Sequence, residues 1–165
     1  MRYVCSFRSL LCMPAAALLL TLMAHPAAAG FDEALKALQG GDMAAAEKEL
    51  QPLAKERDPR AEFLLGFYVY GSAESKLLDI SKAAPLLLDA AERGYLPAII
   101  PLAGAFAEGN GVPKSAFEAY KWIAIAERWN VPNAEVALTR AAQDLSPDDI
   151  AKAKAAALAY TFKSK

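Results

Sequence analysis

The sequence contains only two cysteines and one histidine, and all three lie near its start, at Cys5, Cys12 and His25. From residue 30 to the end neither residue type occurs. That absence excludes Cys–His and Ser–His–Asp catalysis, zinc or haem ligation by thiolate or imidazole, and disulfide bonds from this part of the chain. We therefore expect residues 30–165 to hold no cofactor and no metal, and to depend on packing for their stability.

The first 29 residues have the three-part pattern of a secretory signal peptide. Two basic residues, Arg2 and Arg8, precede an uncharged apolar run over positions 9–23, and small residues end the segment at Ala29. This run of 15 residues is shorter than the roughly 20 residues that span a bilayer. We expect cleavage between Ala29 and Gly30, which would leave a mature chain in the periplasm or secreted, without a membrane span.

A strong charge of either sign is also absent. Removing Arg2 and Arg8 with the leader leaves 16 of the 18 basic residues against all 19 acidic residues, and the two signs are mixed along the chain. No basic tract indicates nucleic-acid binding. The 136 residues that follow the leader are enough for one domain with a buried core and too few for two.

Alternating β-branched runs, which indicate strands, are nearly absent as well. Alanine and leucine recur at helical spacing, and turn-forming residues cut the chain into pieces of ordinary helix length. The cuts fall at Gly40-Gly41, Asp58-Pro59, Gly71, Gly94, Gly109-Asn110-Gly111, Val131-Pro132 and Ser146-Pro147. Residues suited to helix N-caps are Asp42, Asp58, Asp79 or Ser81, Ser115 and Ser146. The sequence therefore predicts an all-helical chain.

Apolar residues recur with a period of 36 to 37 positions. Ala61 and Leu65 return as Ala98 and Leu102 and again as Ala134 and Leu138, while Ala83 and Ala90 return as Ala119 and Ala126. A period in the thirties is typical of solenoids, in which each helical hairpin stacks on the next because it cannot bury its apolar face alone.

These repeats resemble the Sel-one-like repeat family, a branch of the tetratricopeptide superfamily. The second full unit carries the resemblance in Ala98, Leu102, Phe106, Gly109, Gly111, Val112, Ser115, Ala119, Trp122 and Ala126. The first full unit carries it in Ala61, Leu65, Gly66, Tyr68, Gly71, Asp79, Lys82, Ala83, Ala90, Ala91 and Gly94. It departs from the family pattern at Leu86, which replaces the tryptophan, and in a longer loop before Asp79.

The resemblance implies an all-α, right-handed α-solenoid of stacked antiparallel helical hairpins, with about four helix pairs. The domain 30–165 then divides into a leading hairpin (31–57), two repeats (58–94 and 95–130) and a closing helical pair (132–162). Trp122 occupies a core position of the family, whereas Trp129 is a surface candidate.

The stretch from Gly109 to Ser115 is superficially similar to a phosphate-binding loop. Such a loop needs four residues between its first glycine and a Gly-Lys-Ser/Thr, and it follows a strand. Here Pro113 precedes Lys114 and a helix precedes the turn. We interpret the stretch as a corner, in which Gly109 and Gly111 adopt unusual φ angles and Ser115 caps the next helix.

The aromatic residues of the segment 58–70 divide into two sets at 100° per residue. Ala61, Leu65 and Tyr68 point one way; Phe63, Phe67 and Tyr70 point nearly the opposite way. By resemblance the first helix of each unit lines the concave surface, so the second set is a candidate partner-binding face. Equivalent positions in the next units extend this face to Ile100, Gly104, Ala107, Val136, Arg140 and Gln143. The alternative is that a neighbouring helix buries this stripe as core.

The expected function is that of a non-enzymatic adaptor of the bacterial envelope, which binds another envelope or secreted protein in its concave groove. A narrower alternative, also from the resemblance, is a periplasmic immunity protein that neutralises a secreted toxin. A third is a β-lactam-binding or hydrolysing enzyme, which the sequence disfavours because residues 30–165 contain no Ser-x-x-Lys and no cysteine. We assign no catalytic residue.

Overall fold

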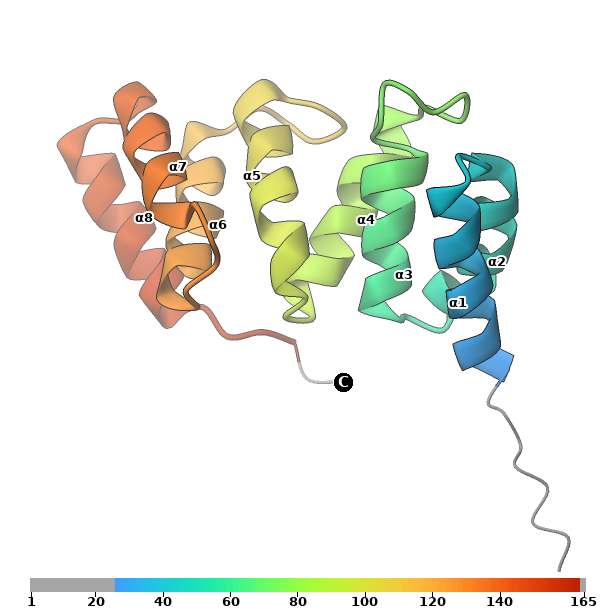
Figure 1. Ribbon diagram of the computed structural model, residues 1–165. Helices are drawn as coiled ribbons and strands as arrows, with labels where there is room; N and C mark the ends of the chain where they lie inside the picture. The colour runs from blue at the N-terminus through green and yellow to red at the C-terminus, as the bar shows by residue number, and fades with distance from the viewer. Residues whose placement is uncertain (1–25, 164–165) are drawn as a thin grey trace, which may run out of the picture.

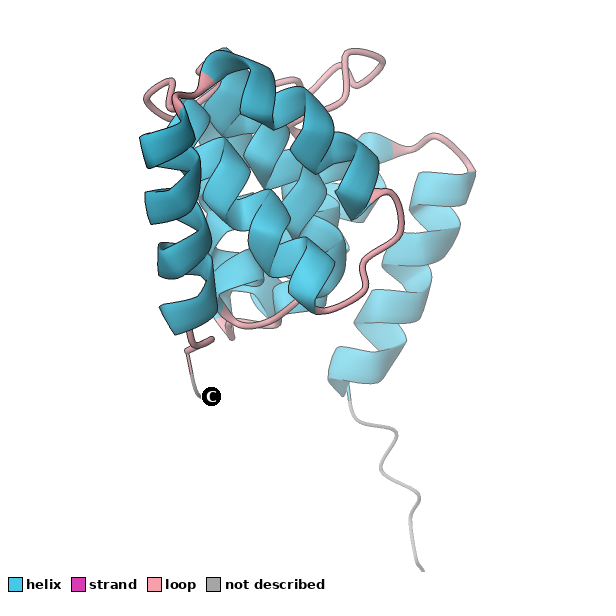
Figure 2. Cartoon of the chain, turned by 90° about the vertical axis from the view of Figure 1, so that its left-hand side faces the viewer, coloured by secondary structure: helices cyan, strands magenta, loops and turns pink. Residues whose placement is uncertain are grey.

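The computed structural model describes residues 26–163, and every regular element in that range is helical (Figures 1 and 2). The α-helices are α1 (Pro26–Gln39), α2 (Met43–Lys55), α3 (Pro59–Leu64), α4 (Ile80–Glu92), α5 (Ile99–Glu108), α6 (Ala116–Arg128), α7 (Ala134–Ala141) and α8 (Pro147–Ala159). A π-helical segment, η1 (Leu65–Val69), continues α3. Short 3-10 segments, η2 (Leu96–Ala98) and η3 (Ala142–Asp144), adjoin α5 and α7. The all-helical prediction is confirmed.

The predicted leader, with Cys5, Cys12 and His25, lies outside the described residues apart from its last four positions. The bond between Ala29 and Gly30, where we expect cleavage, falls within α1. Among residues 26–163, no helix combines the length and the apolar character needed to cross a membrane.

The helices stack in pairs along the molecule (Figure 1). α1 packs against α2, α3 against α4, and α5 against α6, with α1, α3 and α5 in a front row and α2, α4 and α6 behind them. Residues from successive pairs share two buried clusters, one around α2, α3 and η1 and the other around α5, α6 and α8. Trp122 is 2 % exposed in the second cluster, as the sequence predicts. The chain is an α-solenoid.

The last two helices, α7 and α8, fall within residues 132–162, where a closing helical pair is predicted. Both α7 and α8 make their main contacts with α6 rather than with each other. α7 is short and buries only Ala134 and Leu138, whereas α8 buries Ala153 and Ala157.

The predicted caps explain where the helices begin. The side chain of Asp42 accepts a hydrogen bond from the Ala45 amide, Ser115 from Glu118, and Ser146 from Asp149. These bonds satisfy amide groups that have no partner inside the helix. In the corner before α6, Gly109 and Gly111 have φ angles of 82° and 72°, which glycine adopts without strain. The corner interpretation is confirmed.

One local feature overturns part of the predicted helical phase. In η1 the amide of Tyr70 donates to the carbonyl of Leu65, 2.9 Å away and five residues earlier. This wider turn rotates the residues after Leu65 relative to a regular α-helix. As a result Tyr70 is buried, with 6 % of its surface exposed, while Tyr68 is 43 % exposed. The prediction that Tyr70 faces the groove and Tyr68 packs inward is wrong.

After α8 the chain runs along the lower edge of the molecule toward the end of α4 (Figure 1). The ring of Tyr160 packs edge-on against Trp122 at 5.1 Å between centroids, and Phe162 lies 5.6 Å from Trp129. The amide of Lys163 donates to the carbonyl of Glu92 at 2.7 Å. Arg128 holds the end of α8 by donating to the carbonyls of Ala157, Leu158 and Tyr160. We call residues 160–163 the tail.

Removing the tail should destabilise the solenoid. Tyr160 and Phe162 are both half-buried, and loss of two such aromatic contacts is expected to cost about 2 kcal/mol. Urea denaturation of a chain ending at Ala159 would measure this loss. A chain that lacks only Ser164 and Lys165 is the matched control, and equal stability of the two truncated proteins would contradict the prediction.

Candidate functional site

Four aromatic side chains form one cluster on the face predicted to bind a partner. Phe63 stacks on Phe67 with centroids 5.5 Å apart, and Tyr68 meets Phe67 edge-on at 4.9 Å. Tyr95, which follows α4, lies 5.3 Å from Phe63. Phe67 and Tyr68 remain 41 % and 43 % exposed. The aromatic cluster therefore presents two large rings that the fold itself does not cover.

A groove lies beside this cluster, between η1 and α5, with α4 as its floor. Its volume is about 210 Å³. The lining residues are Gly66, Phe67, Gly71, Ile80, Ala83, Ala84, Leu87, Pro101, Gly104, Ala105, Glu108 and Asn110. Only Glu108 among them is charged. We call this hollow the α5 groove; it suits an uncharged apolar side chain.

Gly104 has no internal reason to be a glycine. A Cβ built at this position would meet no atom within 4 Å, and its φ is not positive. By contrast, a Cβ on Gly66 would lie 2.9 Å from the carbonyl oxygen of Ala83, so that glycine is needed for packing of η1 on α4. A glycine inside a helix costs about 1 kcal/mol relative to alanine. Glycine at position 104 therefore leaves the surface of α5 open at this point and makes the helix less stable than alanine would.

The other predicted face residues lie outside the α5 groove. Phe63 is in the aromatic cluster and Ile100 is half-buried on α5, whereas Val136 is 68 % exposed and Arg140 is exposed on α7. A further cavity of about 290 Å³ lies between the ends of α5 and α7, and Ala107 contributes to it. The structure thus brings together Phe67 and Gly104 and leaves Val136 and Arg140 on a separate helix.

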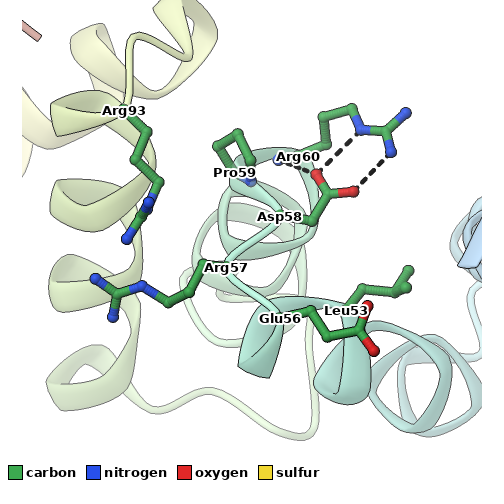
Figure 3. Close-up of a pocket in the computed structure, with 7 residues that line it drawn as sticks. All are labelled: Leu53, Glu56, Arg57, Asp58, Pro59, Arg60 and Arg93. Carbon is green, nitrogen blue, oxygen red and sulfur yellow. Dashed lines mark hydrogen bonds and ion pairs between the residues drawn. The ribbon is translucent and has the colours of Figure 1, made fainter. Parts of the chain in front are cut away.

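A polar cavity of about 560 Å³ opens where α2 ends, α3 begins and α4 ends (Figure 3). Its lining residues are Leu53, Glu56, Arg57, Asp58, Pro59, Arg60 and Arg93. Arg60 is already engaged with Asp58, whose carboxylate it contacts at 2.6 Å. This hydrogen-bonded pair holds the pKa of Asp58 below its usual range.

Glu62 lies beside the other two arginines of this cavity and is 2 % exposed. Its carboxylate oxygens are 4.0 Å from Nε of Arg57 and 3.7 Å from Nε of Arg93. Burial, with the nearby charge of Asp89, raises the pKa of Glu62. Because these carboxylates balance Arg57 and Arg93, the cavity has no excess positive charge to attract an anion.

Within residues 26–163, no three carboxylates lie in an arrangement that could hold a metal ion. Glu118 forms an ion pair with Lys121 on the same helix. Pairs of this kind are common on helix surfaces.

Sequence reasoning missed Tyr68 and Tyr95 as members of the aromatic cluster. The position of Tyr68 depends on the π-helical turn, for which the sequence has no separate signal. Tyr95 follows Gly94, the end of its repeat, so its approach to Phe63 depends on how repeats stack. Burial raises the pKa of Tyr95.

No protein-family model matches the sequence, and no curated protein matches it. Among solved structures, the chain is similar to a protective antigen present in uropathogenic Escherichia coli strains, whose crystal structure displays an SLR fold. The TM-score is 0.71 at 19 % sequence identity, over 79 % of this chain and 29 % of that chain. This chain therefore spans less than a third of the antigen's length.

The stacked helical pairs define a helical-repeat protein. The structural similarity places it more narrowly: the chain has the Sel-one-like repeat fold, as its repeat motifs predict.

Proposed function

We propose that this protein is a non-enzymatic interaction module that binds a segment of a partner protein in the α5 groove. The observation that carries the proposal is the combination of exposed rings at Phe67 and Tyr68 with the unobstructed surface of Gly104. Exposed aromatic side chains next to a hollow are typical of interface anchors. The Sel-one-like repeat fold supports this class of function, because solenoids offer extended binding surfaces.

We further propose that the partner is an envelope or secreted protein. The support is the predicted leader with its expected cleavage after Ala29. Val136 and Arg140 would contact the same partner only if it extends beyond the α5 groove along α7, since neither residue lines that groove.

The test is crosslinking in the native host, followed by identification of captured proteins. Phe67→Ala is expected to lower the yield of the specific partner about tenfold, because the ring is an interface anchor. Gly104→Leu should do the same by filling the groove. Gly104→Ala should raise the free energy of unfolding by about 0.5–1 kcal/mol, which would show that the glycine is not kept for stability.

Leu158→Ala is the control variant, since Leu158 is 71 % exposed on α8 and lies outside the groove. It should leave the yield unchanged. Capture of the same partner in equal amounts by the parent, Phe67→Ala and Gly104→Leu would overturn the assignment of the groove.

A further inference from the structure

The tail binds on α6 and at the end of α4. The equivalent positions on α4 and α2, one repeat earlier, form a second surface of interest. Tyr160 of the tail packs on Trp122 of α6, and Lys163 forms an ion pair with Glu92 at the end of α4. Burial, together with the charge of Glu92, raises the pKa of Tyr160 to about 12. Tyr160 thus packs on α6, while Lys163, three residues later, reaches the last residue of α4.

The equivalent positions one repeat earlier follow from the helix boundaries. α2, α4 and α6 each have 13 residues. Lys55 is the last residue of α2, as Glu92 is of α4. Leu86 is the seventh residue of α4, as Trp122 is of α6. The counterpart of the tail site is thus the surface between Lys55 and Leu86.

That surface is a depression of about 480 Å³, and no part of the chain from 26 to 163 fills it as the tail fills its own site. Its lining residues are Gln51, Ala54, Lys55, Leu65, Tyr70, Ser81, Lys82, Pro85 and Leu86. We call it the α2–α4 depression. A leucine stands where α6 has a tryptophan, so there is room for an added ring.

The floor of the depression is apolar and well fixed. Leu65 is 2 % exposed and Tyr70 is 6 % exposed. The hydroxyl of Tyr70 donates to Glu47 at 2.5 Å, so this ring exposes little unsatisfied polarity. An aromatic side chain of an occupant would meet these groups and Leu86, much as Tyr160 meets Trp122.

The charge at the rim is the reverse of that at the tail site, because Lys55 stands at the end of α2 where Glu92 stands at the end of α4. A second lysine, Lys82, also lines the depression. Lys82 lies 3.1 Å from Asp79, whereas Lys55 forms no ion pair within residues 26–163. The tail of a second copy would bring Lys163 toward two lysines and be repelled. An occupant with a carboxylate at this position would be attracted.

We propose that the α2–α4 depression binds an extended segment of a partner polypeptide, with an aromatic side chain on Leu86 and a carboxylate beside Lys55 and Lys82. The site lies between α2 and α4, apart from the α5 groove, and it does not depend on the function proposed for that groove.

The proposal can be tested with two fluorescein-labelled peptides and the purified protein. One peptide has the tail sequence LAYTFK (residues 158–163), and the other, LAYTFE, differs only in its last residue. Fluorescence anisotropy should give a Kd for LAYTFE at least tenfold lower than that for LAYTFK. The Lys55→Glu variant should remove this preference, and Leu86→Ala should weaken binding of both peptides, because it removes the apolar side chain on which the aromatic ring packs.

Lys48→Glu is the control, because Lys48 is exposed on α2 and does not line the depression. It should bind LAYTFE as the parent does. Equal affinity for the two peptides, or a preference unchanged in Lys55→Glu, would overturn the proposal. A dimer in analytical ultracentrifugation that Leu86→Ala dissociates would also overturn it, by showing that a second copy is the occupant.

Discussion

An Arg93→Ala variant is expected to unfold with a free energy about 3 kcal/mol lower than that of the parent at pH 7. The cause is Glu62, which is 2 % exposed and lies 3.7 Å from Arg93. Without Arg93, the closest remaining cation is Arg57 at 4.0 Å, and its side chain is half-exposed and screened by water. A buried carboxylate that has lost its counter-charge is costly. Urea denaturation, followed by tryptophan fluorescence, measures the change.

The stability lost in Arg93→Ala should depend on pH, in a direction set by the carboxyl group of Glu62. Burial raises the pKa of Glu62 above its ordinary value of 4.5. Between that ordinary value and the raised one, the folded protein holds a proton that the unfolded chain has released, so this group's contribution to stability falls as pH rises. The effect of Arg93→Ala should therefore be large at pH 7 and small near pH 4, where Glu62 is protonated.

Two further variants separate this cause from loss of packing. In a Glu62→Gln background, Arg93→Ala should cost less than about 1 kcal/mol, since no buried charge remains. Arg60→Ala is the control for removing an arginine from the same cavity. Its pair with Asp58 is half-exposed, and such pairs contribute about 0–1 kcal/mol. An equal cost for Arg93→Ala in both backgrounds would contradict the explanation.

Local signals in the sequence predicted much of the fold. Asp42, Ser115 and Ser146 cap helices where the turn residues place them, because a cap depends only on residues three positions apart. The resemblance to the Sel-one-like repeat family placed Trp122 in the core, where it is 2 % exposed. Stacking of the units then follows from the need to bury their apolar faces.

The candidate site was harder to predict because its residues depend on contacts between units. A regular period of 3.6 leaves Tyr70 exposed and packs Tyr68 inward, yet with the π-helical turn at Leu65 Tyr70 is buried and Tyr68 is exposed. Gly104 could be named from its spacing, but only the empty space around its Cβ shows that packing does not require it. From the sequence alone, Glu62 would be assigned to the exposed surface of a helix. The structure buries it beside Arg57 and Arg93.

Gly111→Ala is expected to destabilise the protein by about 2–4 kcal/mol. The residue has a φ of 72°, which costs an alanine about 1 kcal/mol. In addition, a Cβ at this position would overlap the carbonyl oxygen of Ile80 and lie 3.1 Å from Cβ of Ala84. Because the obstacle is the backbone of α4, the corner must move away from it, and such overpacking costs about 1–3 kcal/mol. Thermal or urea unfolding would measure the total.

Gly41→Ala supplies the matched control for this prediction. Gly41 has a φ of 76°, but a Cβ there would meet nothing within 4 Å, so only the backbone strain of about 1 kcal/mol should appear. The difference between the two variants then isolates the contact between the Gly109–Ser115 corner and the first turn of α4. Equal losses of stability in the two variants would mean that position 111 requires glycine only for its positive φ. A larger loss for Gly111→Ala would mean that this glycine also sets how closely the second repeat stacks on the first.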